Sequence, residues 1–289
     1  MGTEGVAASW ARSFTVALGL DRPPVQISYL ETEPEGVPEH VGPVPSVCTF
    51  FAEGRERPFY AALPAHEACE IGAFVLGIPA EGAVGERLRA TLGRMAAEGY
   101  LSPEEAARVP HNRRAPRFVA YGPLGSLPYE PTVVLFLVNP KTTMLLLEAA
   151  GDPGPLLGRP MCSLVPVLLG GAPVAVSVGC TGSRLYGRLS DDLLIVGLRG
   201  DRTAAVADRL ATTVAANRWL AEEDGRRREA VPPPSRRSAA PRREPAAGPA
   251  SPPGRAPAVA RKRPRGVSGS RPGSAPPPDR TRRRRGLRR

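Results

Sequence analysis

Several familiar motifs are missing from this sequence of 289 residues, and each absence excludes a class of function. There is no G-x-S-x-G elbow and no ordered Ser, His and Asp set, so a triad hydrolase is excluded. There is also no G-x-G-x-x-G run and no Walker loop, which excludes the common nucleotide-binding loops. The N-terminal residues lack a charged segment followed by an apolar one, as a secretory signal would have, so we expect a cytoplasmic protein.

Positive charge is scarce in most of the chain and concentrated at its end. Residues 226–289 carry 20 basic and 3 acidic residues, a net charge of +17, whereas residues 1–225 carry −6. The basic end has 14 prolines and no Phe, Trp or Tyr. Such a composition cannot bury enough apolar surface to fold, so we predict a disordered tail over residues 226–289.

The tail's charge suits non-specific binding to nucleic acid or to an anionic surface. Arginines on a flexible segment release counterions from a polyanion, with strong salt dependence and no sequence readout. The lack of aromatic residues excludes base stacking. Arginine also outnumbers lysine throughout, with only Lys141 and Lys262 as lysines. A GC-rich coding sequence would produce the same bias, so compositional drift is an alternative explanation of the tail.

Residues 1–225 show alternating strand and helix patterns. Predicted strands cover 25–30, 59–63, 118–121, 132–138, 174–178 and 193–198, and predicted helices cover 6–18, 48–52, 69–76, 84–95, 141–150 and 202–223. Residues 102–105 (SPEE) predict a further helix start, with serine as the N-cap, proline at the first position and glutamate at the third, as in a capping box. The segment TVVLFLV at 132–138 is apolar on both faces, which is typical of a central strand. We therefore expect a single α/β or α+β domain with one main mixed sheet flanked by helices.

One uncharged segment, residues 160–183, needs to be tested as a membrane span. Pro166, Gly170, Gly171 and Pro173 divide it into pieces too short to cross a bilayer. A buried helix end followed by a buried strand fits the pattern better. We expect no transmembrane segment.

The four cysteines, Cys48, Cys69, Cys162 and Cys180, are the most suggestive residues. Each lies beside a turn or the start of a predicted helix, where free N–H groups favour a thiolate. Four thiolates from separate loops could hold an iron–sulfur cluster or a zinc ion. His66 is a possible further ligand, because it precedes Cys69 by three residues, about one helical turn.

Two other interpretations of the cysteines stay open. No C-x-x-C pair occurs, although most structural zinc sites and ferredoxin-type clusters take two ligands from one short loop. Free cysteine is also often simply buried, so the four could be inert core residues. A redox-reactive thiol is the third possibility. Disulfides are not expected in a cytoplasmic protein.

A glycine-rich turn around Cys180 is a candidate anion site. Backbone N–H groups between Gly179 and Gly182 could bind an anion with help from Arg184, and Arg159 offers a fork suited to carboxylate or phosphate. The structural alternative is a tight turn in which Arg184 pairs with a carboxylate such as Asp191 or Asp192. Those two acidic residues are expected in a solvated turn.

The remaining histidines offer little chemistry. His40 and His111 lie in loops rich in proline and arginine, and we expect both to be exposed. Only His66 is retained as a candidate site residue.

Several strings of residues, in order, resemble a known family. They are Pro24-Val25, Cys48, 66–72 (HEACEIG), 121–124 (YGPL), 138–140 (VNP), 158–162 (GRPMC), 179–184 (GCTGSR) and Asp191-Asp192. Together they resemble the bacterial and archaeal family known as domain of unknown function 169, over roughly residues 7–220. The resemblance implies no established substrate or catalytic residue. Members typically have proline where this chain has Glu70, and often arginine at Lys141.

Two hypotheses of function follow. The first is a metal- or iron–sulfur-binding protein using the four cysteines, with redox chemistry if it is an enzyme. The second is a non-enzymatic module that binds a small anion near Arg159 and Arg184, keeps its cysteines in the core, and attaches to a polyanion through its tail.

Overall fold

The computed structural model describes residues 3–158 and 160–230. The predicted tail and Arg159 lie outside the described residues, apart from the first residues of the tail. The described elements are, in chain order, α1 (Thr3–Leu18), β1 (Val25–Leu30), α2 (Val47–Gly54), β2 (Phe59–Ala62), η1 (Leu63–His66), α3 (Glu70–Val75), α4 (Gly82–Ala97), α5 (Pro103–Ala107), β3 (Phe118–Pro123), β4 (Val133–Val138), α6 (Pro140–Ala150), β5 (Leu156–Leu157), η2 (Met161–Ser163), α7 (Leu164–Leu169), β6 (Val174–Ser177), α8 (Thr181–Leu185), β7 (Leu194–Arg199), η3 (Gly200–Arg202) and α9 (Thr203–Ala230).

The strands form one mixed sheet in the order β2-β3-β1-β4-β7-β6-β5. Every neighbouring pair is antiparallel except β5 and β6, which are parallel. The apolar strand β4 lies at the centre, between β1 and β7, as its two-sided hydrophobic pattern predicts. The expected α/β class with a single main sheet is confirmed.

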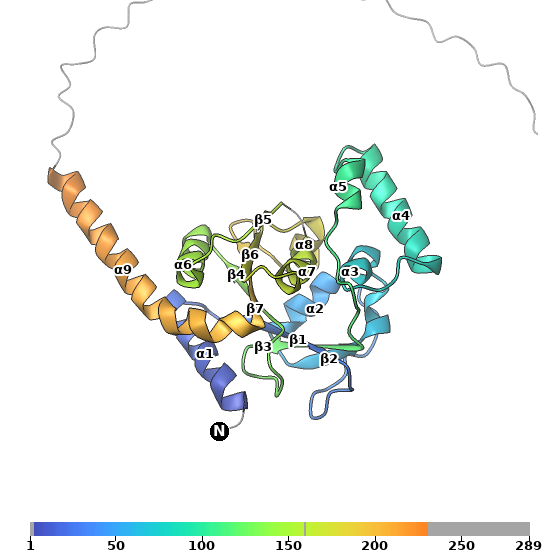
Figure 1. Cartoon of the computed structure of the whole chain (residues 1–289), viewed down its shortest axis with the longest axis horizontal. Helices are drawn as coiled ribbons and strands as arrows, with labels where there is room; N and C mark the ends of the chain where they lie inside the picture. The colour runs from blue at the N-terminus through green and yellow to red at the C-terminus, as the bar shows by residue number, and fades with distance from the viewer. Residues whose placement is uncertain (1–2, 159, 231–289) are drawn as a thin grey trace, which may run out of the picture. The chain divides into compact units, whose positions relative to one another are not determined.

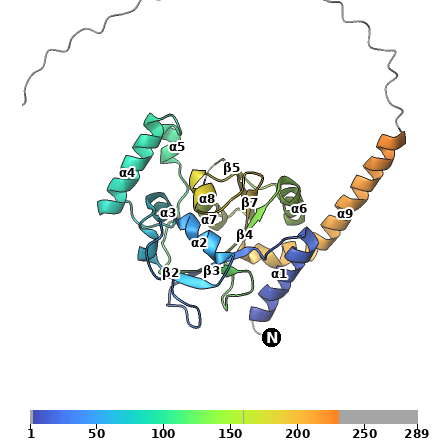
Figure 2. The ribbon, with the colours of Figure 1, turned by 180° about the vertical axis from the view of Figure 1, so that it is seen from behind.

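Helices cover both faces of this sheet (Figures 1 and 2). Along β4, Val133 and Leu135 join the core on the face of α2, α3 and α7. Val134 and Phe136 join the core beneath α1, α6 and α9. Successive side chains of a strand point to opposite faces, so one apolar strand supplies two cores.

The last helix is longer than predicted. The sequence-based boundary at Gly225 falls inside α9, which continues to Ala230. Glu223 accepts a hydrogen bond from Arg226 at 2.6 Å and lies 3.4 Å from Arg227, so ion pairs within one turn support the helix past the glycine.

The uncharged segment at 160–183 forms α7, β6 and the start of α8 rather than one continuous helix. None of the helices in the described part of the chain is both long and apolar enough to cross a membrane.

Candidate functional site

All four cysteines lie at the start of a helix on the same face of the sheet. Cys48 is the second residue of α2, and Cys162 lies in η2, which leads directly into α7. Cys69 and Cys180 are the N-cap residues of α3 and α8, and the Cys180 sulfur accepts the Ser183 N–H at 3.4 Å. The start of a helix carries the positive end of its dipole, which favours negative charge close by.

The four cysteines line a single cavity of about 830 Å³, here called the cysteine cavity. One wall is the group of helix starts that carries the cysteines. The other walls come from α4, α5 and β5, through residues such as Leu92, Met95 and Leu157. Figures 1 and 2 show α4 and α5 beside α3, on the side of the molecule away from α6 and α9.

Gly72 allows α3 to approach α2 closely. A Cβ atom at this position would lie 2.4 Å from Val47 Cγ2 and 3.0 Å from the Cys69 sulfur. Because a side chain there would clash with Val47, the glycine at position 72 lets α3 lie close to the start of α2.

Two serines accompany the cysteines. Ser46 caps α2 by accepting the Cys48 N–H at 3.2 Å, and its hydroxyl lies 3.8 Å from the Cys69 sulfur. The Ser183 hydroxyl lies 3.4 Å from the Cys180 sulfur and accepts the Met161 N–H at 3.4 Å. Sequence reasoning missed both serines. Ser46 could have been found as the N-cap before the predicted helix at 48–52, but nothing in the sequence singles out Ser183.

Burial keeps two of the thiols protonated. It raises the pKa of Cys48 to about 12, while hydrogen bonds from Ser46 and Ser183 act in the opposite direction and the charges of Cys180 and Cys69 raise it further. Burial also raises the pKa of Cys162 well above the usual range, and the other three cysteines add to this shift. Cys69 and Cys180, by contrast, are only partly buried.

The sulfurs do not surround a single point as zinc ligands would. Tetrahedral zinc, with Zn–S bonds of about 2.3 Å, needs sulfurs roughly 3.8 Å apart. Within residues 3–158 and 160–230, no three or more His, Cys, Asp or Glu side chains are arranged to hold one metal ion.

His66 lies apart from the cysteine cavity, in an aromatic core. Its Nδ1 is 3.2 Å from the carbonyl oxygens of both Ala62 and Leu63, so this nitrogen carries the proton. Its Nε2 then accepts the Tyr121 hydroxyl at 3.0 Å. Burial lowers the His66 pKa to about 4. The imidazole is neutral and both nitrogens are occupied by protein partners.

Arg184 is engaged within its own turn. It donates to the carbonyl oxygens of Ser190 at 2.9 Å and Val178 at 3.0 Å, and it pairs with Asp191 at 3.2 Å. This is the arrangement that the structural alternative predicts. Asp191 and Asp192 lie in an exposed turn, also as expected.

The glycines of the same turn have distinct positions. Gly179 adopts a φ of +78°, and a Cβ there would lie 2.6 Å from Leu189 Cδ2, so the turn before Cys180 requires glycine. Gly182 lines the cysteine cavity, where a Cβ would be 3.6 Å from the Cys180 sulfur. Gly179 is thus required by the backbone conformation of the turn, whereas Gly182 leaves space beside the Cys180 sulfur.

The expectation that His40 is exposed is wrong. Its side chain is only 9% exposed and lies 3.4 Å from Glu53, with ring centroids 5.1 Å from Phe50 and 5.4 Å from Phe59. The surrounding proline-rich loop suggested solvent exposure, but two aromatic rings distant in sequence enclose the imidazole. His111 is exposed, as predicted.

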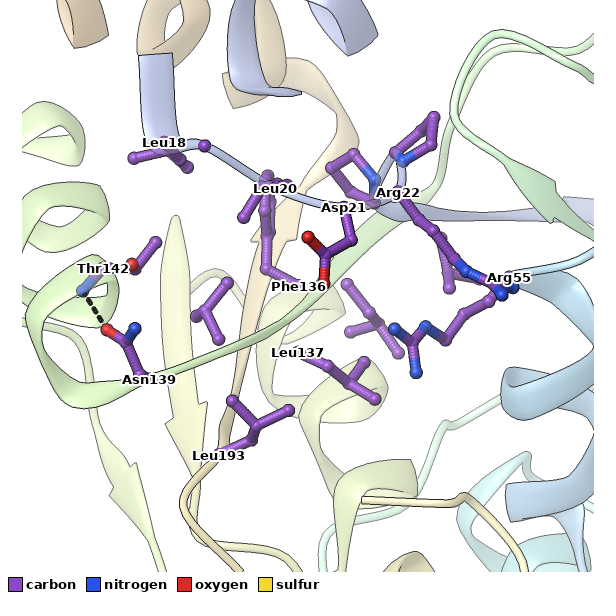
Figure 3. Close-up of a pocket in the computed structure, with 16 residues that line it drawn as sticks. Leu18, Leu20, Asp21, Arg22, Arg55, Phe136, Leu137, Asn139, Thr142 and Leu193 are labelled. Atoms are coloured by element: carbon purple, nitrogen blue, oxygen red, sulfur yellow. Dashed lines mark hydrogen bonds between the residues drawn. The ribbon is translucent and has the colours of Figure 1, made fainter. Parts of the chain in front are cut away.

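A second, smaller cavity of about 180 Å³ lies where the chain passes from α1 to β1 (Figure 3). Arg22, which lines it, pairs with Glu56 outside it, and the Asn139 side chain accepts the Thr142 N–H at 2.9 Å, which caps α6. None of the candidate site residues lines this cavity.

Comparison with known proteins identifies a family and nothing more specific. Residues 13–209 match the family described as uncharacterised ArCR, DUF169. No curated protein and no solved structure matches the chain. The matched region contains all four cysteines, both serines and every strand of the sheet, and it spans well over half of the chain. The chain belongs to the uncharacterised ArCR family, DUF169.

Proposed function

We propose that the chain binds a [4Fe–4S] cluster in the cysteine cavity, with Cys48, Cys69, Cys162 and Cys180 as its ligands. The observation that carries the proposal is that every cysteine of the sequence lines this one cavity. Four thiolates are the usual ligand set of such a cluster. His66 is left out of the ligand set because it does not line the cavity and both its nitrogens have protein partners.

A cubane of iron and sulfide holds its ligands farther apart than a single ion does, and the cysteine cavity of about 830 Å³ has room for it. In the described part of the chain, no three ligating side chains are placed to hold a single ion. Supplying the ligands from four separate helix starts also removes the need for a C-x-x-C loop.

Binding a cluster would require the buried thiols to lose their protons. Uncharged thiols are the stable form of Cys48 and Cys162 in their buried positions. Iron would displace their protons, and the helix starts would stabilise the negative charge that four thiolates and the sulfides bring. The cluster would supply one-electron transfer, and the space beside α4 and α5 would admit a redox partner or substrate.

The anion-binding module has less support. Arg184 is committed to Asp191 and two carbonyl oxygens and does not line the cysteine cavity. Arg159 and most of the basic tail lie outside the described residues. We retain polyanion binding by the tail as a proposal, tested by removing residues 231–289 and measuring salt-dependent retention on a polyanion resin.

Anaerobic reconstitution with iron and sulfide tests the cluster. The wild-type chain is expected to become brown and to contain about four irons and four sulfides, and each Cys→Ser variant to lose most of both. Ala149→Ser is the matched control, because it places the same hydroxyl in the aliphatic core on the other face of the sheet. Stoichiometric zinc without iron, or cysteine variants that load like the wild type, would overturn the proposal.

A further inference from the structure

We propose that Ser46 and Ser183 donate O–H hydrogen bonds to the cysteine sulfurs that hold the cluster and thereby raise its reduction potential. This inference rests on the proposed function. The two hydroxyls are tuning groups, since they act on the cluster through its ligands.

Ser46 is oriented by the helix that it caps. Its oxygen accepts the Cys48 N–H at 3.2 Å, and its side chain is nearly buried, at 6% exposed for the residue. Because the Ser46 oxygen acts as the acceptor for this N–H group, its own hydroxyl proton remains available to donate to another acceptor. The Cys69 sulfur, 3.8 Å away, is such an acceptor once it becomes a thiolate.

Ser183 has a similar arrangement beside Cys180. Its oxygen accepts the Met161 N–H at 3.4 Å and lies 3.4 Å from the Cys180 sulfur, which also receives the Ser183 N–H at 3.4 Å. The residue is completely buried, so water does not compete for the hydroxyl. Cys180 therefore receives a backbone and a side-chain donor from one residue.

The direction of the effect follows from charge. Reduction adds an electron to the cluster, and the extra negative charge is shared with the ligand sulfurs. A donor to a sulfur stabilises the reduced form more than the oxidised form, so it raises the potential. The apolar residues that line the site, such as Val47 and Ile71, act in the opposite direction by excluding water.

The test is an equilibrium redox titration of the loaded, full-length chain, followed by the electron paramagnetic resonance of the reduced cluster. Ser46→Gly and Ser183→Ala are each expected to lower the midpoint potential, and the double variant to lower it further. Glycine is a tolerated N-cap, so the first variant keeps α2. Ser46→Thr, which restores the hydroxyl, should return the potential toward the wild-type value.

Ser28→Ala is the matched control. It removes a fully buried hydroxyl that donates to the Glu130 carbonyl oxygen at 2.8 Å on another part of the sheet, so it weakens the fold without touching a sulfur. Its potential should equal that of the wild type. If Ser183→Ala loads poorly, pulsed resonance of exchangeable protons in the wild type provides a second readout, and strongly coupled hydroxyl protons are expected.

The possible failures are distinct. A wild-type chain that takes up no iron overturns the cluster and this inference together. Loaded serine variants with the wild-type potential, or no exchangeable hydroxyl proton near the cluster, overturn the role of the serines alone and leave the cluster in place.

Discussion

The two faces of the sheet are built from the same strands but differ in the helices that cover them. Beneath α1, α6 and α9 the core is aliphatic and aromatic, with Phe14 packed edge-on against Phe136 at 4.9 Å and no cysteine among its buried members. The other face carries short helices, and its core contains Cys48 and Cys162. Long helices bury apolar stripes on the first face, whereas on the second each cysteine lies at the start of a short helix.

This difference separates stability from chemistry. The face of α1, α6 and α9 can be explained by hydrophobic burial alone. The cysteine face includes thiols, serines and a neutral histidine whose burial costs free energy unless each has a partner. We therefore expect substitutions on one face to change stability alone, and substitutions on the other to change stability and metal content together.

The largest effect on folding is expected when a buried side chain is cut back to alanine, and one such variant on each face of the sheet allows the faces to be compared. Phe14→Ala on one face and Leu164→Ala on the other should each lower the free energy of unfolding by about 3–5 kcal/mol, because both side chains are fully buried. Urea denaturation measures this. Iron per folded chain should be unchanged in the first variant and reduced in the second; equal iron in both would erase the distinction between the faces.

A pH effect of intermediate size is expected from His66. Its pKa is about 4 in the fold and about 6.5 when unfolded, so between these values the unfolded chain binds a proton that the fold does not. Stability is therefore lost as pH falls through this range, by about 2 kcal/mol between pH 7 and pH 5. Urea denaturation at the two pH values should show a smaller loss in His66→Gln; an unchanged loss would assign the effect elsewhere.

A smaller effect is expected at α5, one wall of the cysteine cavity. Ser102 and Glu105 form a capping box, with hydrogen bonds of 3.1 Å and 2.6 Å. Ser102→Ala should weaken this helix by about 1 kcal/mol. Hydrogen exchange of the α5 amides should accelerate while those of α6 stay constant. Faster exchange in both helices would mean that the wall and the opposite face are coupled.

The smallest effect is expected at the Arg184–Asp191 pair. Asp191 is 98% exposed on its side chain, so the ion pair should contribute less than about 1 kcal/mol. Asp191→Asn should leave both the urea midpoint and the iron content near the wild-type values. A marked loss of iron would show that this turn, and not only Cys180, controls the site.

Much of the fold could be predicted from the sequence, because hydrophobic patterns and helix caps within a few residues determine where many strands and helices form. The run at 132–138 is apolar on both faces and became the central strand β4, and Ser102-Pro103 began a helix where a capping box was expected. The end of α9 was missed because Gly225 suggested a stop, while Glu223 and its arginine partners extend the helix.

The candidate site was only partly predictable. The position of each cysteine at a helix start follows from the sequence, but the cavity that joins them depends on contacts such as that of Gly72 with Val47, across two helices. Ser183 and the enclosure of His40 also depend on tertiary packing. Serine and histidine are common in loops, so neither position carries a local signal.

The most direct test of the central claim is the Mössbauer spectrum of the wild-type chain after anaerobic loading with ⁵⁷Fe. A [4Fe–4S] cluster held by four cysteines predicts a single class of high-spin, mixed-valence iron with tetrahedral sulfur ligands, at about four irons per chain. A spectrum of oxygen- and nitrogen-bound iron, or no bound iron at all, would contradict a common role for Cys48, Cys69, Cys162 and Cys180.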